Sequence, residues 1–157
     1  MTGRFLVACT LVVASGAVVL GQADNPHLGT WKLNAAKSKY NAGNVPKSGT
    51  TKIEPAGMGV KYTVDQTFAD GTSSHWEFTA NYDGKDVRIN GTSPLGNTVA
   101  LTRVDARTVR IVSKQDAKPT VNQTSVVSSD GKSRMVTTKG TSPSGEAVDG
   151  TVVYERQ

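Results

Sequence analysis

From residue 60 onward the chain alternates apolar and polar residues with a period of two. Val60, Tyr62 and Val64 fall on one face of an extended segment, whereas Lys61 and Thr63 fall on the other. This period is typical of half-buried β-strands, since a helix would repeat its apolar residues every three or four positions. The constraint on the fold is strong, because each strand needs paired neighbours and a cover for its apolar face.

Turn signals separate these segments at short and nearly regular intervals. Asp-Gly or Asn-Gly pairs occur at residues 70–71, 83–84, 90–91 and 130–131, and such pairs supply the positive φ angles that tight hairpins require. We therefore expect an all-β chain with strands at 28–34, 50–54, 60–68, 75–80, 87–90, 98–104, 108–114, 120–128, 133–139 and 147–156. Short strands at this spacing are typical of a sandwich or a barrel.

The least regular stretch is residues 35–48, which lies between the first two expected strands and contains glycine, asparagine and proline. A short helical turn at 35–38 fits its beginning, but nothing in it is long enough to be a stable helix alone. In a barrel, this segment would cross or flank an open end.

Residues 1–23 have the features of a secretory signal peptide. Arg4 precedes an apolar run at residues 5–20, and Gly21 and Ala23 offer the small side chains that a signal peptidase needs. The run is shorter than the roughly 20 residues of a membrane-spanning helix. We expect an exported protein, periplasmic or extracellular, with one domain at residues 24–157 and no transmembrane segment after cleavage. An uncleaved anchor is the alternative.

Cys9 is the only cysteine and lies within the expected signal peptide. The mature chain therefore has no disulfide, although export would permit one. His27 and His75 are the only histidines, so a site of several His or Cys ligands is excluded and no metal or other cofactor is expected.

The formal net charge is +5, and six lysines but only one acidic residue lie between Lys32 and Lys61. This region could bind an anionic envelope surface, or it could be an ordinary solvated exterior. Nucleic acid is not an expected partner, because arginine clusters with interleaved aromatic residues are missing. We expect a monomer.

The two ends of the expected domain carry the most specific motifs. Gly29-Thr30-Trp31-Lys32-Leu33 is similar to the first-strand signature of lipocalins and fatty-acid-binding proteins, and Thr151–Arg156 resembles the last strand of the latter. The chain thus resembles the calycin superfamily, and in particular small exported bacterial proteins grouped as lipocalin-like. The resemblance implies an antiparallel up-and-down barrel of about 8–10 strands with a ligand cavity and without a long helix.

The resemblance also implies roles for individual residues. Gly29, Trp31 and Arg156 would close the barrel, with Arg156 lying across the ring of Trp31. Fatty-acid-binding proteins hold a carboxylate with an Arg-x-Tyr motif in the last strand, but here Val152 stands at the arginine position and leaves Tyr154 alone. They also carry a helical lid after the first strand, which residues 35–48 cannot form.

The expected binding site is therefore the lumen of the barrel. The alternation directs one group of side chains inward as candidate ligand contacts: Tyr62, Phe68, Trp76, Phe78, Arg103 and Tyr154. Met135 and Thr137 are expected to face the lumen as well. Together with Gln123 and Ser125, they predict a partly polar interior, suited to a small amphipathic or hydrophobic ligand.

Three functions remain open at this point. The first is carriage of a small molecule in the lumen, and the second is a filled barrel that binds anionic envelope material through residues 32–61. The third is an enzyme working in the cavity with His75 or Tyr154 as acid or base, although the alternation places His75 on the outer face with Glu77. Since no serine-nucleophile or phosphate-loop motif is present, no catalytic residue is assigned.

Overall fold

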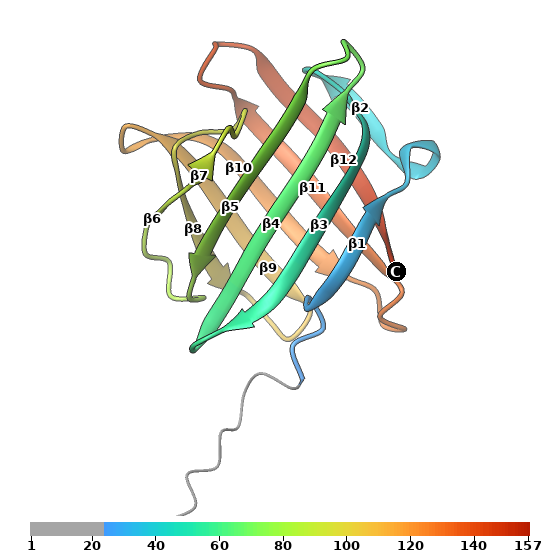
Figure 1. Cartoon of the computed structure of the whole chain (residues 1–157), viewed down its shortest axis with the longest axis vertical. Helices are drawn as coiled ribbons and strands as arrows, with labels where there is room; N and C mark the ends of the chain where they lie inside the picture. Colours follow the sequence, from blue (N-terminus) through green and yellow to red (C-terminus); the bar gives the residue numbers. More distant parts are fainter. Residues whose placement is uncertain (1–23) are drawn as a thin grey trace, which may run out of the picture.

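The computed structural model describes residues 24–157, so the expected signal peptide at 1–23 lies outside the described residues (Figure 1). The elements, in chain order, are β1 (Gly29–Leu33), the 3₁₀ turn η1 (Ala35–Lys37), β2 (Lys39–Ala42), β3 (Pro46–Ala56), β4 (Gly59–Phe68), β5 (Ser73–Ala80), β6 (Val87–Arg88), β7 (Asn90–Gly91), β8 (Thr98–Arg103), β9 (Thr108–Gln115), β10 (Lys118–Val127), β11 (Ser133–Thr141) and β12 (Ala147–Arg156). In this part of the chain, no helix has the length and apolar character needed to cross a bilayer.

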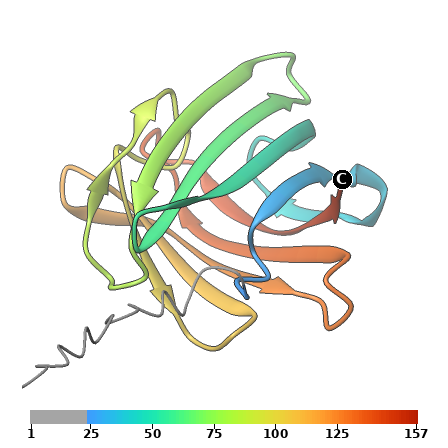
Figure 2. The same ribbon diagram turned by 60° about the horizontal axis from the view of Figure 1, so that its bottom comes forward.

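The twelve strands form one sheet. Eleven of them follow the order β6-β8-β9-β10-β11-β12-β1-β3-β4-β5-β7, and β2 pairs with β12 off this path. Each long strand runs antiparallel to its neighbours, and β1 lies between β12 and β3. The sheet curls into a barrel, and its long strands run diagonally in Figure 2. The predicted all-β antiparallel barrel is confirmed, although three short strands bring the number above the expected 8–10.

A single five-residue segment joins the two edges of the curled sheet. β7 pairs with β5 through Trp76–Gly91 and Glu77–Asn90, while β6 pairs with β8 through two further residue pairs. Ile89 lies between β6 and β7 and is buried in the core. The barrel is therefore nearly closed, and β6 and β7 contribute two residue pairs each to this seam.

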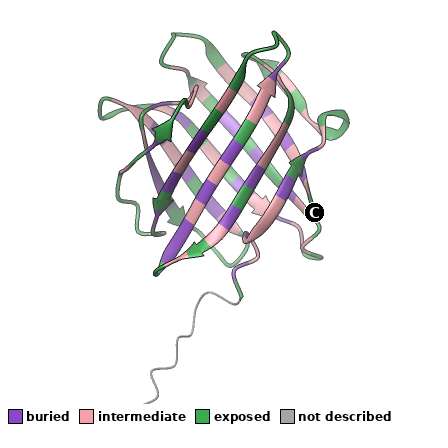
Figure 3. Ribbon diagram, viewed as in Figure 1, coloured by how far each residue is buried: buried purple, intermediate pink, exposed green. Residues whose placement is uncertain are grey.

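Period-two alternation explains which side chains face inward (Figure 3). The expected inward residues of β4 and β5 are all buried, namely Val60, Tyr62, Val64, Phe68, Trp76, Phe78 and Ala80. Burial of a large apolar side chain contributes about 1.5–3 kcal/mol, and without a disulfide in residues 24–157 these contacts and the strand pairing carry the stability.

One strand has the opposite phase from the prediction. In β11 the buried residues are Arg134, Val136 and Thr138, whereas Met135 and Thr137 are exposed. The expectation that Met135 and Thr137 face the lumen is wrong, because the register of β11 with β10 and β12 turns the neighbouring positions inward. Lys139, two residues further along the same face, is exposed and marks it as the outer one.

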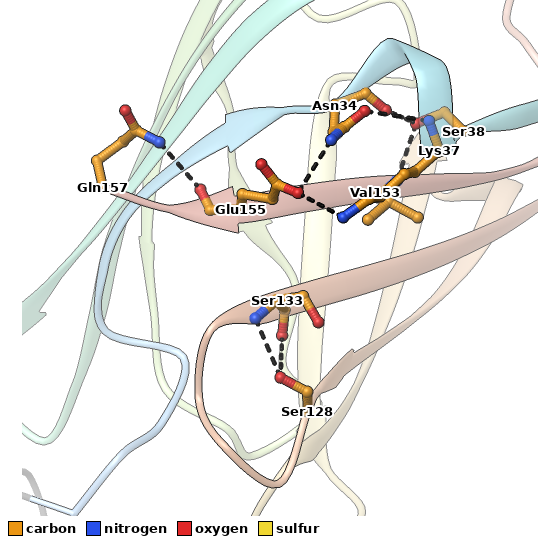
Figure 4. Close-up of polar contacts among 8 residues, drawn as sticks. All are labelled: Asn34, Lys37, Ser38, Ser128, Ser133, Val153, Glu155 and Gln157. Atoms are coloured by element: carbon orange, nitrogen blue, oxygen red, sulfur yellow. Dashed lines mark hydrogen bonds and ion pairs between the residues drawn. The ribbon is translucent and has the colours of Figure 1, made fainter.

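The segment at residues 35–48 is more regular than expected. The predicted turn at its start is η1, but β2 then pairs with β12, and β3 already begins at Pro46. Ser38 fixes this segment to β12, because its hydroxyl accepts a hydrogen bond from the Val153 amide at 2.9 Å (Figure 4). Glu155 adds contacts to Asn34 at 2.9 Å and to Lys37 at 2.8 Å.

Candidate functional site: the barrel cavity

The interior of the barrel encloses a cavity of about 450 Å³. One end is its mouth, because cavity-lining residues there come from the strand connections: Asn44, Thr72, Leu95 and Ser144. At the other end, which is closed, Asn25, His27 and Trp31 are buried. In Figure 1 the β11–β12 connection at the mouth is at the top, and the N-terminal end of the described chain is at the bottom.

Aromatic side chains from β4, β5 and β12 form much of the wall. Tyr62, Phe68, Trp76, Phe78 and Tyr154 all line the cavity, as the sequence predicted. The rings of Tyr62 and Phe78 stack, with their centroids 4.9 Å apart and their planes at 11°. Whether these residues contact a ligand stays a prediction.

Arg103, the remaining candidate, does not line the cavity. Its guanidinium carbon lies 4.2 Å from the ring centroid of Tyr82, which itself receives a hydrogen bond from Asn25 at 3.0 Å. Arg103 is the last residue of β8, and its contact with Tyr82 links it to Asn25 of the N-terminal segment.

Arg134 is the lining residue that the sequence reasoning missed. It is 4% exposed and pairs across the strands with Tyr154. Its guanidinium carbon lies 4.8 Å from the ring centroid of Tyr154 and 5.8 Å from that of Trp31. The sequence does contain a signal for this residue. Arg134 shares one face of its strand with Val136 and Thr138, whereas the charged Lys139 lies on the other face.

The closed end is built around Trp31, which is fully buried. Its indole nitrogen donates to the His27 carbonyl oxygen at 2.8 Å, and Arg156 covers its ring at 4.2 Å from the centroid. Gly29 lies under the guanidinium of Arg156, where a Cβ would collide with Nη1. Gly29, Trp31 and Arg156 therefore lie together, as expected for residues that close the barrel.

His27 is a buried titratable group at this end. Its pKa is lowered to about 4, mainly by burial and also by the charges of Arg134 and Arg103, while the hydrogen bond to the Arg107 backbone and the charge of Asp105 act in the opposite direction. Its Nε2 lies 3.1 Å from the Arg107 carbonyl oxygen and donates to it, which leaves Nδ1 without a hydrogen-bond partner among the described residues.

Polar side chains lie between the apolar ones on the wall of the cavity. Gln66 donates to the Tyr154 hydroxyl at 3.2 Å, and Gln123 donates to the Thr138 hydroxyl at 3.1 Å. Glu146 and Asp149 are the acidic residues among those lining the cavity, and both lie near the mouth. The cavity thus combines apolar walls with a small set of hydrogen-bonding groups, which is the usual composition of a small-molecule site.

His75 is on the outer surface. Its Nδ1 lies 2.7 Å from Asp65 Oδ1, both side chains are exposed, and neither lines the cavity. This placement removes His75 from any chemistry in the lumen. Among residues 24–157 no cluster of three or more His, Cys, Asp or Glu side chains could hold a metal ion.

The lysine-rich region is partly neutralised by neighbouring carboxylates. Lys37 pairs with Glu155 at 2.8 Å, and Lys61 pairs with Glu77 at 2.7 Å. Lys52 makes a further pair with Glu54 at 2.8 Å. These exposed pairs add little stability, but they lower the positive charge that the region offers to an anionic surface.

No protein-family model matches the chain, and no curated protein matches it. Among solved structures, it is similar to the zebrafish ileal bile acid-binding protein, crystallised with cholic acid. The two are 14% identical with a TM-score of 0.46, and the match covers 84% of this chain and 99% of that one. The strand pairing of the chain itself, with the first strand beside the last, gives a calycin-like barrel.

Proposed function

We propose that the protein is an exported carrier that binds a small amphipathic or hydrophobic molecule inside its barrel. The cavity of about 450 Å³ is the observation that supports this proposal most strongly. Small-molecule sites typically have about 300–1,000 Å³ and apolar walls with a few polar groups.

Export is the part of the proposal that rests on residues 1–23. A signal peptide ending at Ala23 predicts that the protein recovered outside the cytoplasm begins at Asp24. N-terminal sequencing of that material tests it directly, and an intact Met1 would support the membrane-anchor alternative instead.

The two rival functions gain less support. The envelope-binding hypothesis supposes a filled barrel and a freely charged lysine region, whereas the lumen is hollow and Lys37, Lys52 and Lys61 are paired with glutamates. The enzyme hypothesis loses His75, which is exposed on the outer face, and retains only Tyr154, which lines the cavity, as its candidate acid or base.

A titration with N-phenyl-1-naphthylamine, an uncharged probe whose fluorescence rises in apolar surroundings, tests the carrier function. The purified chain from Asp24 should bind it with a stoichiometry of one. Thr138→Trp places an indole in the cavity and should weaken binding at least about tenfold, which corresponds to about 1.4 kcal/mol.

Thr137→Trp is the matched control, because Thr137 is the next residue of β11 and is exposed on the outer face. It should bind the probe as tightly as the wild type. Equal affinities of the two tryptophan variants, or no saturable binding to the wild type, would exclude the lumen as a binding site.

A further inference from the structure

We infer that the ligand is an amphipathic monoanion whose charged group, a carboxylate or similar oxyanion, binds Arg134 at the closed end of the cavity. This inference rests on the carrier function proposed above and names the chemical class of its ligand.

Arg134 is a buried positive charge without a compensating negative one. It is 4% exposed, and its Nε and Nη1 have no hydrogen-bond partner among the described residues. Arginine keeps its charge at every pH at which proteins are folded. Since burial of an unpaired charge is strongly unfavourable, an anionic partner in the cavity would offset part of that cost.

The surroundings of Arg134 hold it in place without neutralising it. The rings of Tyr154 and Trp31, at 4.8 and 5.8 Å from its guanidinium carbon, provide cation–π contacts. It is the only basic residue among the described residues that line the cavity, and the acidic ones, Glu146 and Asp149, lie at the mouth. Arg134 therefore gives the inner end of the cavity a positive charge.

Tyr62 supplies a second donor near the same place. Its side chain lines the cavity and is 3% exposed, and its hydroxyl has no hydrogen-bond partner among residues 24–157. Burial raises the pKa of this hydroxyl, while the charges of Arg134 and Arg103 act in the opposite direction. A neutral phenol that lines the same cavity can donate to the same oxyanion, and hydrogen bonds to a charged acceptor are the strong ones.

The charge pattern along the cavity also limits the other end of the ligand. Arg134 lies at the closed end, and Glu146 and Asp149 lie at the mouth. A single anionic group bound at the inner end avoids these carboxylates, whereas a second one at the outer end would be repelled by them. A ligand with one negative charge and an uncharged outer end fits this pattern best.

The experiment compares decanoate with decan-1-ol, which share a chain length and differ in charge, as competitors of the naphthylamine probe at neutral pH. Wild type should bind decanoate at least about tenfold more tightly than decan-1-ol, and more tightly than decanedioate. Arg134→Met should remove the preference for the acid without weakening the binding of the alcohol. Arg134→Lys, which keeps the charge, should retain part of the preference.

Arg110→Met is the matched control, because it removes an arginine that is exposed on β9 and does not line the cavity, and it should keep the wild-type preference. Tyr62→Phe keeps the ring in place, so it provides a second test if Arg134→Met does not fold. It should reduce the affinity for decanoate several-fold and leave that for decan-1-ol unchanged.

The outcomes separate the two proposals. If the probe binds in the lumen but wild type prefers decan-1-ol, or binds both competitors equally, the anion site is overturned and the carrier function stands. If the probe itself does not bind, both are overturned. Melting temperatures add an independent criterion: Arg134→Met should melt above wild type without ligand, whereas a purely structural arginine would give a lower melting temperature.

Discussion

Arg156 and Trp31 face each other across β12 and β1, with the guanidinium carbon 4.2 Å from the centroid of the indole ring. The same guanidinium donates to the carbonyl oxygens of Gly131 at 2.7 Å and Pro26 at 2.7 Å, and to that of Leu28. One side chain thus joins the last strand to the β10–β11 connection and to the segment that closes the barrel.

Arg156→Lys is expected to lower the free energy of unfolding by about 2 kcal/mol. Lysine keeps the positive charge, but its single ammonium group cannot reach three carbonyl oxygens and cover the indole ring at once. Chemical denaturation of both proteins measures the difference. Arg110→Lys, at an exposed position of β9, should change stability by less than about 0.5 kcal/mol; similar losses at both positions would mean that the carbonyl contacts of Arg156 contribute little.

His27 makes the stability depend on pH. Burial lowers its pKa in the folded protein to about 4, from 6.5 in the unfolded chain. Between these values the unfolded chain binds a proton that the folded protein does not, so the free energy of unfolding falls as the pH falls from 6.5 to 4. The contribution is complete above pH 6.5, and about 3 kcal/mol of it is lost by pH 4.

His27→Gln keeps a donor for the Arg107 carbonyl oxygen and removes the titrating ring. Denaturation between pH 4 and 6.5 should therefore show a shallower slope in this variant than in wild type. His75→Gln, which replaces the exposed histidine on the outer face, should keep the wild-type slope. Parallel curves for wild type and His27→Gln would show that His27 is not the group responsible.

The seam between β5 and β8 depends on Gly91. This residue has φ +94°, and a Cβ there would collide with the carbonyl oxygen of His75 on β5. Gly91→Ala is therefore expected to destabilise the barrel by more than about 1 kcal/mol and to speed amide exchange in β5 and β8. Denaturation and hydrogen exchange measure the two effects.

Gly71→Ala is the control for this change. Gly71 also has a positive φ, of +87°, but open space surrounds the position of its Cβ. Gly71→Ala strains the backbone but causes no collision. We therefore expect a smaller loss of stability and no faster amide exchange at the seam. Equal effects of the two alanines would show that the close approach at Gly91 does not hold the seam.

Much of the barrel and of its aromatic wall could be predicted from the sequence, because alternation acts locally. Once a strand is recognised, the period of two fixes which of Tyr62, Trp76 and Phe78 share a face. The contact of Arg156 with Trp31 was also predictable, since closure of a barrel brings the two terminal strands together.

The inner end of the cavity was harder to predict. The register of β11 with β10 and β12 decides which of its side chains face inward, and local sequence does not contain that register. A shift of one position along the strand places Met135 in the lumen instead of Arg134. β2 was missed because its pairing partner, β12, is more than a hundred residues away. Arg103 was placed in the lumen by phase alone, although it ends its strand and contacts Tyr82.

Intermolecular NOEs between decanoate and the methyl groups of the protein test the carrier function most directly. The account predicts NOEs from the ligand chain to Val64, Ile111 and Val136, whose side chains line the cavity, and none to Met58, Val104 and Met135, which are exposed on the outside. NOEs confined to the outer methyl groups, or none at saturating ligand, would contradict it.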